Sequence, residues 1–434
     1  MTRIAIIGGV RTPFARAGGP LAGWQADDLG TFAVQELLAR TRFPVSRLDE
    51  LIAGNVAQPI EAANVARIIA LKAGLPDDLI ASTVHRNCAS GMEAVTTAAI
   101  KIRAGECRAV VCVGAESMSN IPLICNREMT ALFAAVARGK SALARLRPWL
   151  GLRPRHLMPV IGVQVGLTDP VAGLNMGQTA EILAREFAVS RLEQDAFALL
   201  SHRRAVAARS RLADEIAAIP LPGGRGMLDM DDGPRDTQDE AALAKLRPYF
   251  DRVAGTVTVG NACPLTDGAA ATILCDEDLV RELGLPVLGW LTGWAYAALD
   301  GRRMGLGPVH AMAKLQRQTG MRLADFDLVE LNEAFAAQAI ACLRGFASDS
   351  YGQRLGLTAA LGSLDPAKVN VNGGAIALGH PVGATGLRLI ITILHELRRR
   401  AAHRGLATLC VGGGQGAAIA VEAEPRATLV QEAA

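Results

Sequence analysis

The C-terminal third of the chain contains the stretch GLATLCVGGGQGAA (405–418), an apolar strand-like run that ends in glycines. An earlier stretch, RAVVCVGAES (108–117), has the same form. A helical pattern precedes each of them, at 383–400 and at 90–104. Because the similar segments follow one another in the same order, they indicate that the chain contains a duplicated α/β unit.

Strand-like and helical patterns alternate through most of the sequence, which predicts a largely parallel sheet with helices on both faces. We expect strands at 3–9, 48–56, 108–117 and 287–296 and helices at 29–40, 66–73 and 90–104. The segment 324–336 resembles 46–57 and extends the duplication. We therefore expect an N-terminal half made of residues 1–120 plus 251–280, an inserted cap of residues 121–250, and a C-terminal half of residues 281–425.

The composition is that of a globular protein, with 434 residues, of which 50% are hydrophobic and 20% charged. A net charge of +3 over this length argues against a nucleic-acid partner. The eight cysteines form no CxxC pair or metal-like cluster, so we expect a reducing, cytoplasmic setting and no metal. The longest apolar stretches, such as 157–167, are shorter than the ~20 residues that a membrane span needs.

The inserted segment contains a basic and partly apolar stretch, LARLRPWLGLRPRHLMPV (143–160). A solvated helix face with an apolar floor is the simpler interpretation. The alternative is a weak peripheral contact with a membrane surface, or the docking of a partner.

Three glycine-rich segments each surround one reactive side chain: Cys88, His380 and Cys410. A free cysteine is more often buried than reactive. At the start of a helix, however, the helix dipole and free N–H groups would lower the pKa of the Cys88 thiol, and a histidine could take its proton. Backbone N–H groups in a glycine-rich turn can stabilise an oxyanion. No GxGxxG fingerprint or GxxxxGK[ST] loop accompanies these segments, which excludes nucleotide-dependent redox chemistry and phosphoryl transfer as first choices.

Together, these and other motifs resemble the thiolases, the CoA-dependent 3-ketoacyl-CoA acyltransferases. The motifs are VRTPFARAGGPLAG (10–23), NCASG (87–91), TVTVGNACPLTDGAAA (256–271), NEAFAAQ (332–338), GHPVGATG (379–386) and CVGGGQG (410–416). The long insertion and the segments 246–258 and 348–370 resemble the fatty-acid-oxidation branch that includes the trifunctional β-subunit. The resemblance implies duplicated βαβαβαββ halves that form a layered α-β-α-β-α core with an inserted loop domain.

The resemblance also implies roles for individual residues. Cys88 would attack the 3-keto carbon and carry the acyl group, and His380 would deprotonate Cys88. Cys410 would act as acid and base on the acetyl-CoA carbon. Asn332 would position a water beside His380 in one oxyanion hole. The N–H groups of Cys88 and Gly412 would form the other hole. Coenzyme A would be a co-substrate, with no permanently bound cofactor, and its contacts would be Cys263, Ala262 and Met176.

Two positions differ from the short-chain members of the family. Cys263 stands where those members resemble NASG, and Asn175 stands where they commonly place a histidine. The difference at Asn175 argues against a biosynthetic thiolase specific for acetoacetyl-CoA. A thiol donates a weaker hydrogen bond than a serine hydroxyl, so Cys263 is either a CoA contact or a packing residue. A ketoacyl synthase would need a second histidine where NEAFA stands. A non-catalytic CoA- or lipid-binding relative should lack at least one of Cys88, His380 and Cys410, and all three are present.

The remaining cysteines and histidines have simpler interpretations. We expect the cysteines to lie in the core and the histidines to lie on the surface; they are Cys107, Cys112, Cys125, Cys275 and Cys342, and His156, His202, His310, His395 and His403. Glu333 is expected either to hydrogen-bond within the site, the interpretation we favour, or to order the loop beside it. The resemblance implies a homodimer or homotetramer and a hydratase–dehydrogenase partner subunit.

Overall fold

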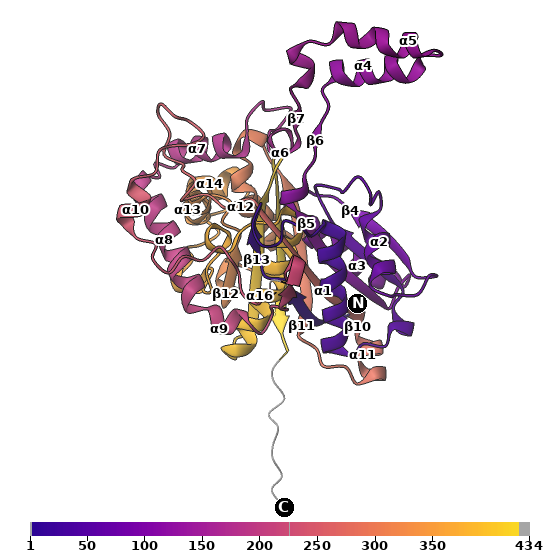
Figure 1. Cartoon of the computed structure of the whole chain (residues 1–434). Coiled ribbons are helices and arrows are strands. Elements are labelled where there is room, and N and C mark those ends of the chain that lie inside the picture. The colour runs from indigo at the N-terminus through magenta and orange to yellow at the C-terminus, as the bar shows by residue number, and fades with distance from the viewer. Residues whose placement is uncertain (1, 225, 425–434) are drawn as a thin grey trace, which may run out of the picture.

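One mixed sheet of ten strands runs through the whole molecule in the computed structural model (Figure 1). The structure describes residues 2–224 and 226–424, so residues 1 and 425 of the expected domains lie outside it. The strand order is β12-β13-β14-β11-β1-β10-β5-β3-β4, and β2 (Ala15–Arg16) pairs with β10. The strands are β1 (Ile4–Arg11), β3 (Glu50–Gly54), β4 (Ile80–Val84), β5 (Ala109–Ser117), β10 (Thr266–Asp276), β11 (Gly289–Ala298), β12 (Leu328–Leu331), β13 (Arg404–Val411) and β14 (Gln415–Ala423).

The two halves of the sheet have the same strand order, which confirms the duplication. β3 pairs parallel with β5, and β5 pairs antiparallel with β10. In the second half, β12 pairs parallel with β13, and β13 pairs antiparallel with β14. The counterpart of β4 is reduced to one parallel bridge between Val329 and Val369. β1 and β11 pair antiparallel, so the two expected sheets are joined edge to edge into one.

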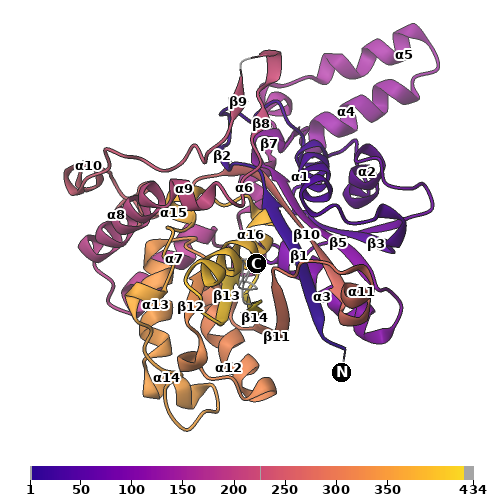
Figure 2. The same cartoon turned by 90° about the horizontal axis from the view of Figure 1, so that it is seen from below.

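Helices cover both faces of each half, which gives the expected five layers (Figure 2). The helices are α1 (Ala26–Thr41) and α2 (Val65–Lys72) on one outer side, α3 (Ser90–Ala104) and α16 (Val382–Arg399) in the centre, and α12 (Gly307–Thr319) and α13 (Ala336–Phe346) on the other outer side. Alternate residues of one strand enter different cores: Ala5 and Ile7 pack under α1, whereas Ile4 and Ile6 face the central helices. Both faces of the sheet are therefore apolar.

The central helices α3 and α16 pack backbone against backbone. A Cβ atom at Gly91 would lie 2.8 Å from the backbone nitrogen of Leu387 and 2.9 Å from the carbonyl oxygen of Gly383. A Cβ atom at Gly386 would lie 2.9 Å from the backbone nitrogen of Met92. These contacts explain the small residues in the NCASG and GATG motifs, and they bring the N-terminal ends of the two helices together.

The chain between β5 and β10 forms an arm and a cap. The arm contains α4 (Arg127–Arg138) and α5 (Ala142–Leu146), projects away from the body, and joins it through β6 (Leu123–Ile124) and β7 (Val160–Ile161) (Figure 1). The rest forms the cap; its helices are α6 (Gly162–Gly166), α7 (Met176–Glu186), α8 (Arg191–Ala207), α9 (Arg209–Leu212) and α10 (Glu240–Ala244), and its strands are β8 (Ile219–Pro220) and β9 (Met227–Leu228). α7 and α8 pack against α13 of the C-terminal half, whereas the segment that leads into β8 bonds to β1 of the N-terminal half. Two more helices, α14 (Asp349–Arg354) and α15 (Ala375–Leu378), follow in the C-terminal half, and α11 (Glu277–Leu283) follows β10.

Two expectations about burial were wrong in part. Cys125 is exposed because it lies at the base of the arm, whereas Cys107, Cys112, Cys275 and Cys342 are buried as expected. Among the five histidines expected on the surface, His202 is buried between α8 and the loop that contains Arg235. His403 is exposed, and the other three are half-buried.

A buried ion cluster ties β1 to the cap. The guanidinium of Arg11, which is 0% exposed, donates to Glu215 at 2.6 Å and to both carboxylate oxygens of Asp231 at 2.6 and 2.8 Å. The hydroxyl of Thr392, from α16, also donates to Glu215, at 2.9 Å. The cluster therefore joins three segments that are distant in sequence.

Replacing Arg11 with alanine leaves two buried carboxylates without their cation. We expect Arg11→Ala to lower the free energy of unfolding by about 3–5 kcal/mol, measured by urea unfolding followed by circular dichroism. The control is Arg281→Ala, whose ion pairs with Glu277 and Asp278 are largely exposed, and which should cost less than about 1 kcal/mol. Equal stability of the two variants would contradict a structural role for the cluster.

Candidate active site

Cys88 lies in the tight turn between β4 and α3. The backbone N–H groups of Cys88 and Gly412 both lie close enough to its thiol to favour the thiolate and so lower its pKa. Gly412 belongs to the turn between β13 and β14, so the two donors come from opposite halves of the chain. This is the pair of N–H groups that the sequence predicted for an oxyanion hole, gathered around the predicted nucleophile.

The expected lowering of the Cys88 pKa does not occur. Burial raises the pKa of the thiol, and the two N–H groups only reduce that rise. The nearby carboxylate of Glu116 adds to the rise. A thiol in this state is protonated at neutral pH, so Cys88 needs a base to become a nucleophile.

His380 has the protonation state that such a base requires. The hydroxyl of Thr385 donates to the Pro381 carbonyl at 2.9 Å, so at 2.6 Å it accepts a hydrogen from Nδ1 of His380. Nε2 therefore carries the lone pair, and it is buried without a partner among the described residues. Burial, with the neighbouring Arg388 cation, lowers the pKa of His380 to about 4. The imidazole is neutral at physiological pH, with a bare Nε2.

Cys410 lies at the end of β13 and is 1% exposed. Burial raises the pKa of its thiol well above the usual value, and the nearby thiols Cys88, Cys342 and Cys263 raise it further. Cys410 therefore holds a proton at neutral pH close to Cys88. This arrangement suits a residue that first donates a proton to carbon.

The side-chain amide of Asn332 is buried, and neither its nitrogen nor its oxygen has a partner among the described residues. Its backbone is fixed by an N–H bond to the Thr408 carbonyl at 3.0 Å, which places it beside β13. Buried amides are normally hydrogen-bonded, so this one is free to hold a water or a ligand atom.

The neighbouring Glu333 was expected to hydrogen-bond within the site or to order the loop beside it; its partners lie on α8, on α15 and in the segment before α15. Its carboxylate accepts from the Ser201 hydroxyl at 2.6 Å, the Asn370 amide at 2.8 Å and the Ile376 backbone N–H at 3.3 Å. It orders the segment that leads to His380.

The predicted CoA contacts lie on the side of Cys410. Met176, Ala262 and Cys263 pack in one cluster with Cys410. The sulfur of Met176 would lie 3.3 Å from a Cβ atom at Gly412. The structure brings these residues together, and their contact with CoA stays a prediction.

Sequence reasoning missed Glu116, which is fully buried at the end of β5. Its carboxylate accepts from the backbone N–H groups of Ala57 and Gly383, both at 2.9 Å, and of Val56 at 3.2 Å. Burial raises its pKa to about 7. An acid at the end of an otherwise apolar strand was the signal that could have identified it.

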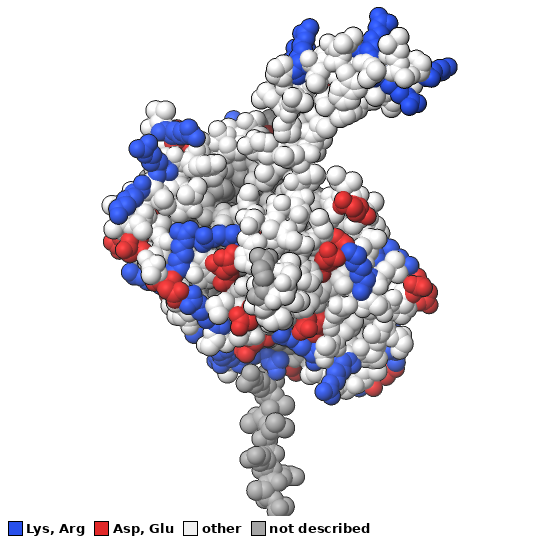
Figure 3. All heavy atoms as spheres, in the orientation of Figure 1, with Lys and Arg blue, Asp and Glu red and all other residues white. Residues whose placement is uncertain are grey.

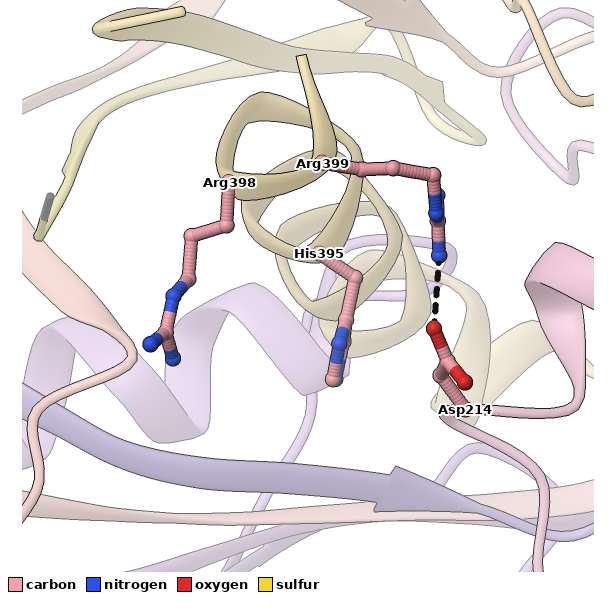
Figure 4. Close-up of a pocket in the computed structure, with 4 residues that line it drawn as sticks. All are labelled: Asp214, His395, Arg398 and Arg399. Atoms are coloured by element: carbon pink, nitrogen blue, oxygen red, sulfur yellow. Dashed lines mark hydrogen bonds and ion pairs between the residues drawn. The ribbon is translucent and has the colours of Figure 1, made fainter. Parts of the chain in front are cut away.

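Other features lie outside this centre. Figure 4 shows a cavity of about 270 Å³ lined by Asp214, His395, Arg398 and Arg399. It lies at the C-terminal end of α16, about 27 Å along the helix from the end that follows His380. Within residues 2–224 and 226–424, no group of three or more His, Cys, Asp or Glu side chains could hold a metal ion. None of the helices described there is long and apolar enough to cross a membrane.

Comparisons with known proteins agree with this arrangement. The chain is 42% identical over 426 residues to proteins named 3-ketoacyl-CoA thiolase from Escherichia coli O6:H1 and Salmonella choleraesuis, with 97% of each chain covered. Human mitochondrial 3-ketoacyl-CoA thiolase has a similar structure, with a TM-score of 0.84, 34% identity and coverage of 97% of this chain and 99% of that one. Bacillus anthracis acetyl-CoA acetyltransferase gives a TM-score of 0.85, 36% identity, and coverage of 98% and 99%.

Family models described as "Thiolase, N-terminal domain" and "Thiolase, C-terminal domain" match residues 4–278 and 285–423. With the duplicated fold and the cysteine, histidine and glycine loops gathered between its halves, these matches show that the chain belongs to the thiolase family.

Proposed function

We propose that the protein is a 3-ketoacyl-CoA thiolase. It cleaves a 3-ketoacyl-CoA with free CoA to acetyl-CoA and a shortened acyl-CoA, and it catalyses the reverse condensation of acetyl-CoA. The observation that carries the proposal is the Cys88 thiol held by the N–H groups of Cys88 and Gly412. The neutral His380 and the protonated Cys410 supply the proton transfers that this chemistry needs.

In the first step, Nε2 of His380 takes the proton of Cys88, and the thiolate attacks the 3-keto carbon. The bond between the α and β carbons breaks, and acetyl-CoA leaves as an enolate that Cys410 protonates. His380 and a water held by Asn332 stabilise the enolate oxygen. The N–H groups of Cys88 and Gly412 turn from the thiol to the oxygen on the carbon under attack.

In the second step, Cys410 takes the thiol proton of an entering CoA. The CoA thiolate attacks the acyl-Cys88 thioester, and the acyl group moves to CoA. Cys88 leaves as a thiolate and recovers its proton from His380. One carbon–carbon cleavage is thereby divided into two thioester exchanges, which is the advantage of covalent catalysis.

Asn175 is the position at which the chain differs from the short-chain members in a way that bears on substrate length. Asn175, which stands where short-chain members commonly place a histidine, caps α7 by accepting from the Gln178 N–H at 2.9 Å. Its side chain is committed to the helix start. This supports a broader range of acyl chains, which a panel of 3-ketoacyl-CoA substrates of rising length would measure.

Coenzyme A would act only as a co-substrate, with no permanent cofactor, in a cytoplasmic protein that assembles as a homodimer or homotetramer.

The arm is the feature that suits a contact with a second protein or with a membrane surface. Leu143, Leu150, Leu157 and Met158 are more than 60% exposed, and Figure 3 shows mainly basic charge there. A hydratase–dehydrogenase subunit would dock there, or an anionic membrane surface would touch it weakly. Native mass spectrometry and flotation with anionic vesicles would separate these two partners.

The covalent intermediate gives the direct test of the function. Incubation with acyl-CoA should add one acyl group to the native protein, as detected by intact mass spectrometry, and Cys88→Ala should add none. Cys125→Ala, which removes an exposed cysteine on the arm, is the matched control and should acylate normally. An adduct on Cys88→Ala would show that another residue is the nucleophile.

The acid and base role of Cys410 is separable from acylation. Cys410→Ala should still form acyl-Cys88 but exchange the α-protons of acetyl-CoA with D₂O about 10²–10⁴-fold more slowly, as followed by NMR. Cys342→Ala removes another nearby thiol, one that is not a predicted CoA contact, and should retain exchange within a few-fold. If Cys410→Ala exchanges at the native rate, the assignment is wrong.

The low pKa of His380 sets the pH dependence of acylation. A base must be unprotonated to act, so activity is lost as pH falls through the pKa of His380, which is about 4. We expect the rate of Cys88 acylation, measured by pH-jump and quench, to hold from neutral pH down to about pH 5 and to fall below it. A midpoint near 6.5, the value of an exposed histidine, would contradict the buried, neutral state of His380.

A further inference from the structure

The two residues before Cys88 reach across to the opposite half of the chain. The side-chain amide of Asn87 donates to the Gly412 carbonyl at 2.8 Å. The guanidinium of Arg86 donates to the side-chain oxygen of Gln415 at 3.1 Å. These bonds tie the loop that contains Cys88 to the turn that contains Gly412, the two segments whose N–H groups hold the thiol.

The turn that receives these bonds is made mainly of glycine, and besides the pairing of Val411 with Gln415 it is held by the Leu299 N–H, which donates to the Gly414 carbonyl at 2.8 Å. Gly413 and Gly414 both have positive φ values, +84° and +78°. Glycine has more backbone freedom than any other residue, so a turn built from three of them needs external contacts to hold one conformation. The bond from Asn87 is made to Gly412 itself.

Asn87 has an unusual backbone conformation that makes this contact available. Its φ is +43°, in the left-handed region, which few residues other than glycine adopt and which asparagine tolerates best. Its carbonyl accepts from the Ser90 hydroxyl at 2.7 Å and from the Ser90 backbone N–H at 3.0 Å. The backbone is thus fixed by α3, and the side chain points to the other half.

Arg86 is held equally firmly. Its guanidinium donates to the carboxylate of Glu93 at 2.6 and 3.1 Å and lies 4.2 Å from the centre of the Tyr296 ring. Arg86, Tyr296 and Gln415 also line a cavity of about 430 Å³. The second bond of the pair therefore starts from a rigid donor.

We propose that Asn87 and Arg86 form a clamp between the halves that positions the Gly412 N–H relative to the Cys88 N–H. Asn87 is the principal positioning residue, since it bonds Gly412 directly. The inference rests on the proposed function, because the two N–H groups act on the oxyanion of the thioester exchange. Loss of one oxyanion donor typically costs about 10²–10³ in kcat, so displacement of that donor should cost somewhat less.

The decisive variant is Asn87→Gly, because glycine keeps the left-handed conformation and removes only the amide. We expect kcat to fall about 10–100-fold, with the KM for CoA within about threefold of native, because the donors act on the transition state rather than on CoA binding. Asn87→Asp, which tolerates the same φ but cannot donate to a carbonyl, should show the same loss. Arg42→Gly, at another left-handed position at the end of α1, is the matched control and should keep native kinetics.

A second measurement needs no substrate. The Gly412 N–H stabilises the Cys88 thiolate, so its displacement in Asn87→Gly should move the pH profile of Cys88 alkylation by iodoacetamide to higher pH. The thermal midpoint of Asn87→Gly is compared with that of Arg42→Gly to check that the variant is folded. An unchanged kcat, a change confined to KM, or an unmoved alkylation profile would each overturn the clamp. If the native protein forms no acyl adduct, the proposed function fails instead, and the alkylation profile still tests the clamp.

Discussion

The close contact between α3 and α16 is the constraint on which the site depends. Glycine at 91 and 386 lets the two backbones approach until no side chain fits between them. One helix follows Cys88 and the other follows His380, so this contact brings residues that are almost 300 positions apart in sequence to the same place. A larger residue at either glycine would separate the helices and with them the nucleophile and its base.

Burial in this five-layer core also determines the electrostatics. Desolvation favours neutral forms, so it keeps protons on the thiols of Cys88 and Cys410 and keeps His380 neutral. Under the proposed function, the reaction would therefore begin with proton transfer from Cys88 to His380 rather than with a preformed thiolate. The side-chain amide of Asn332 and Nε2 of His380 are buried there without a hydrogen-bond partner among the described residues. Buried polar groups without partners cost about 1–3 kcal/mol each, which a bound substrate or water can recover.

Much of the fold and of the candidate site was predictable from the sequence, because both depend on local patterns. The expected helix at 90–104 matches α3, and the run at 383–400 matches α16 within one residue at each end, since apolar period and glycine placement decide both. The set Cys88, His380, Cys410, Asn332 and Gly412 came from motifs in the family order. The fold places Cys410 and Gly412 near Cys88 and Asn332 beside β13. The division into residues 1–120 with 251–280, 121–250 and 281–425 stays a prediction.

What could not be predicted depends on three-dimensional surroundings. The direction of the Cys88 pKa shift could not be predicted, because it depends on desolvation raising the pKa by more than the two N–H groups lower it. The joining of two sheets through β1 and β11, the exposure of Cys125 and the burial of His202 depend on which segments pack together. Glu116 is the clearest example, because the duplicated fold gives its position a counterpart in the other half of the chain. It ends β5 much as Cys410 ends β13, yet its carboxylate accepts from the Gly383 N–H in the first turn of α16. One half uses its strand end to anchor the helix that follows His380, and in the proposed mechanism the other would use the equivalent position for proton transfer. Only the packed structure distinguishes these two uses.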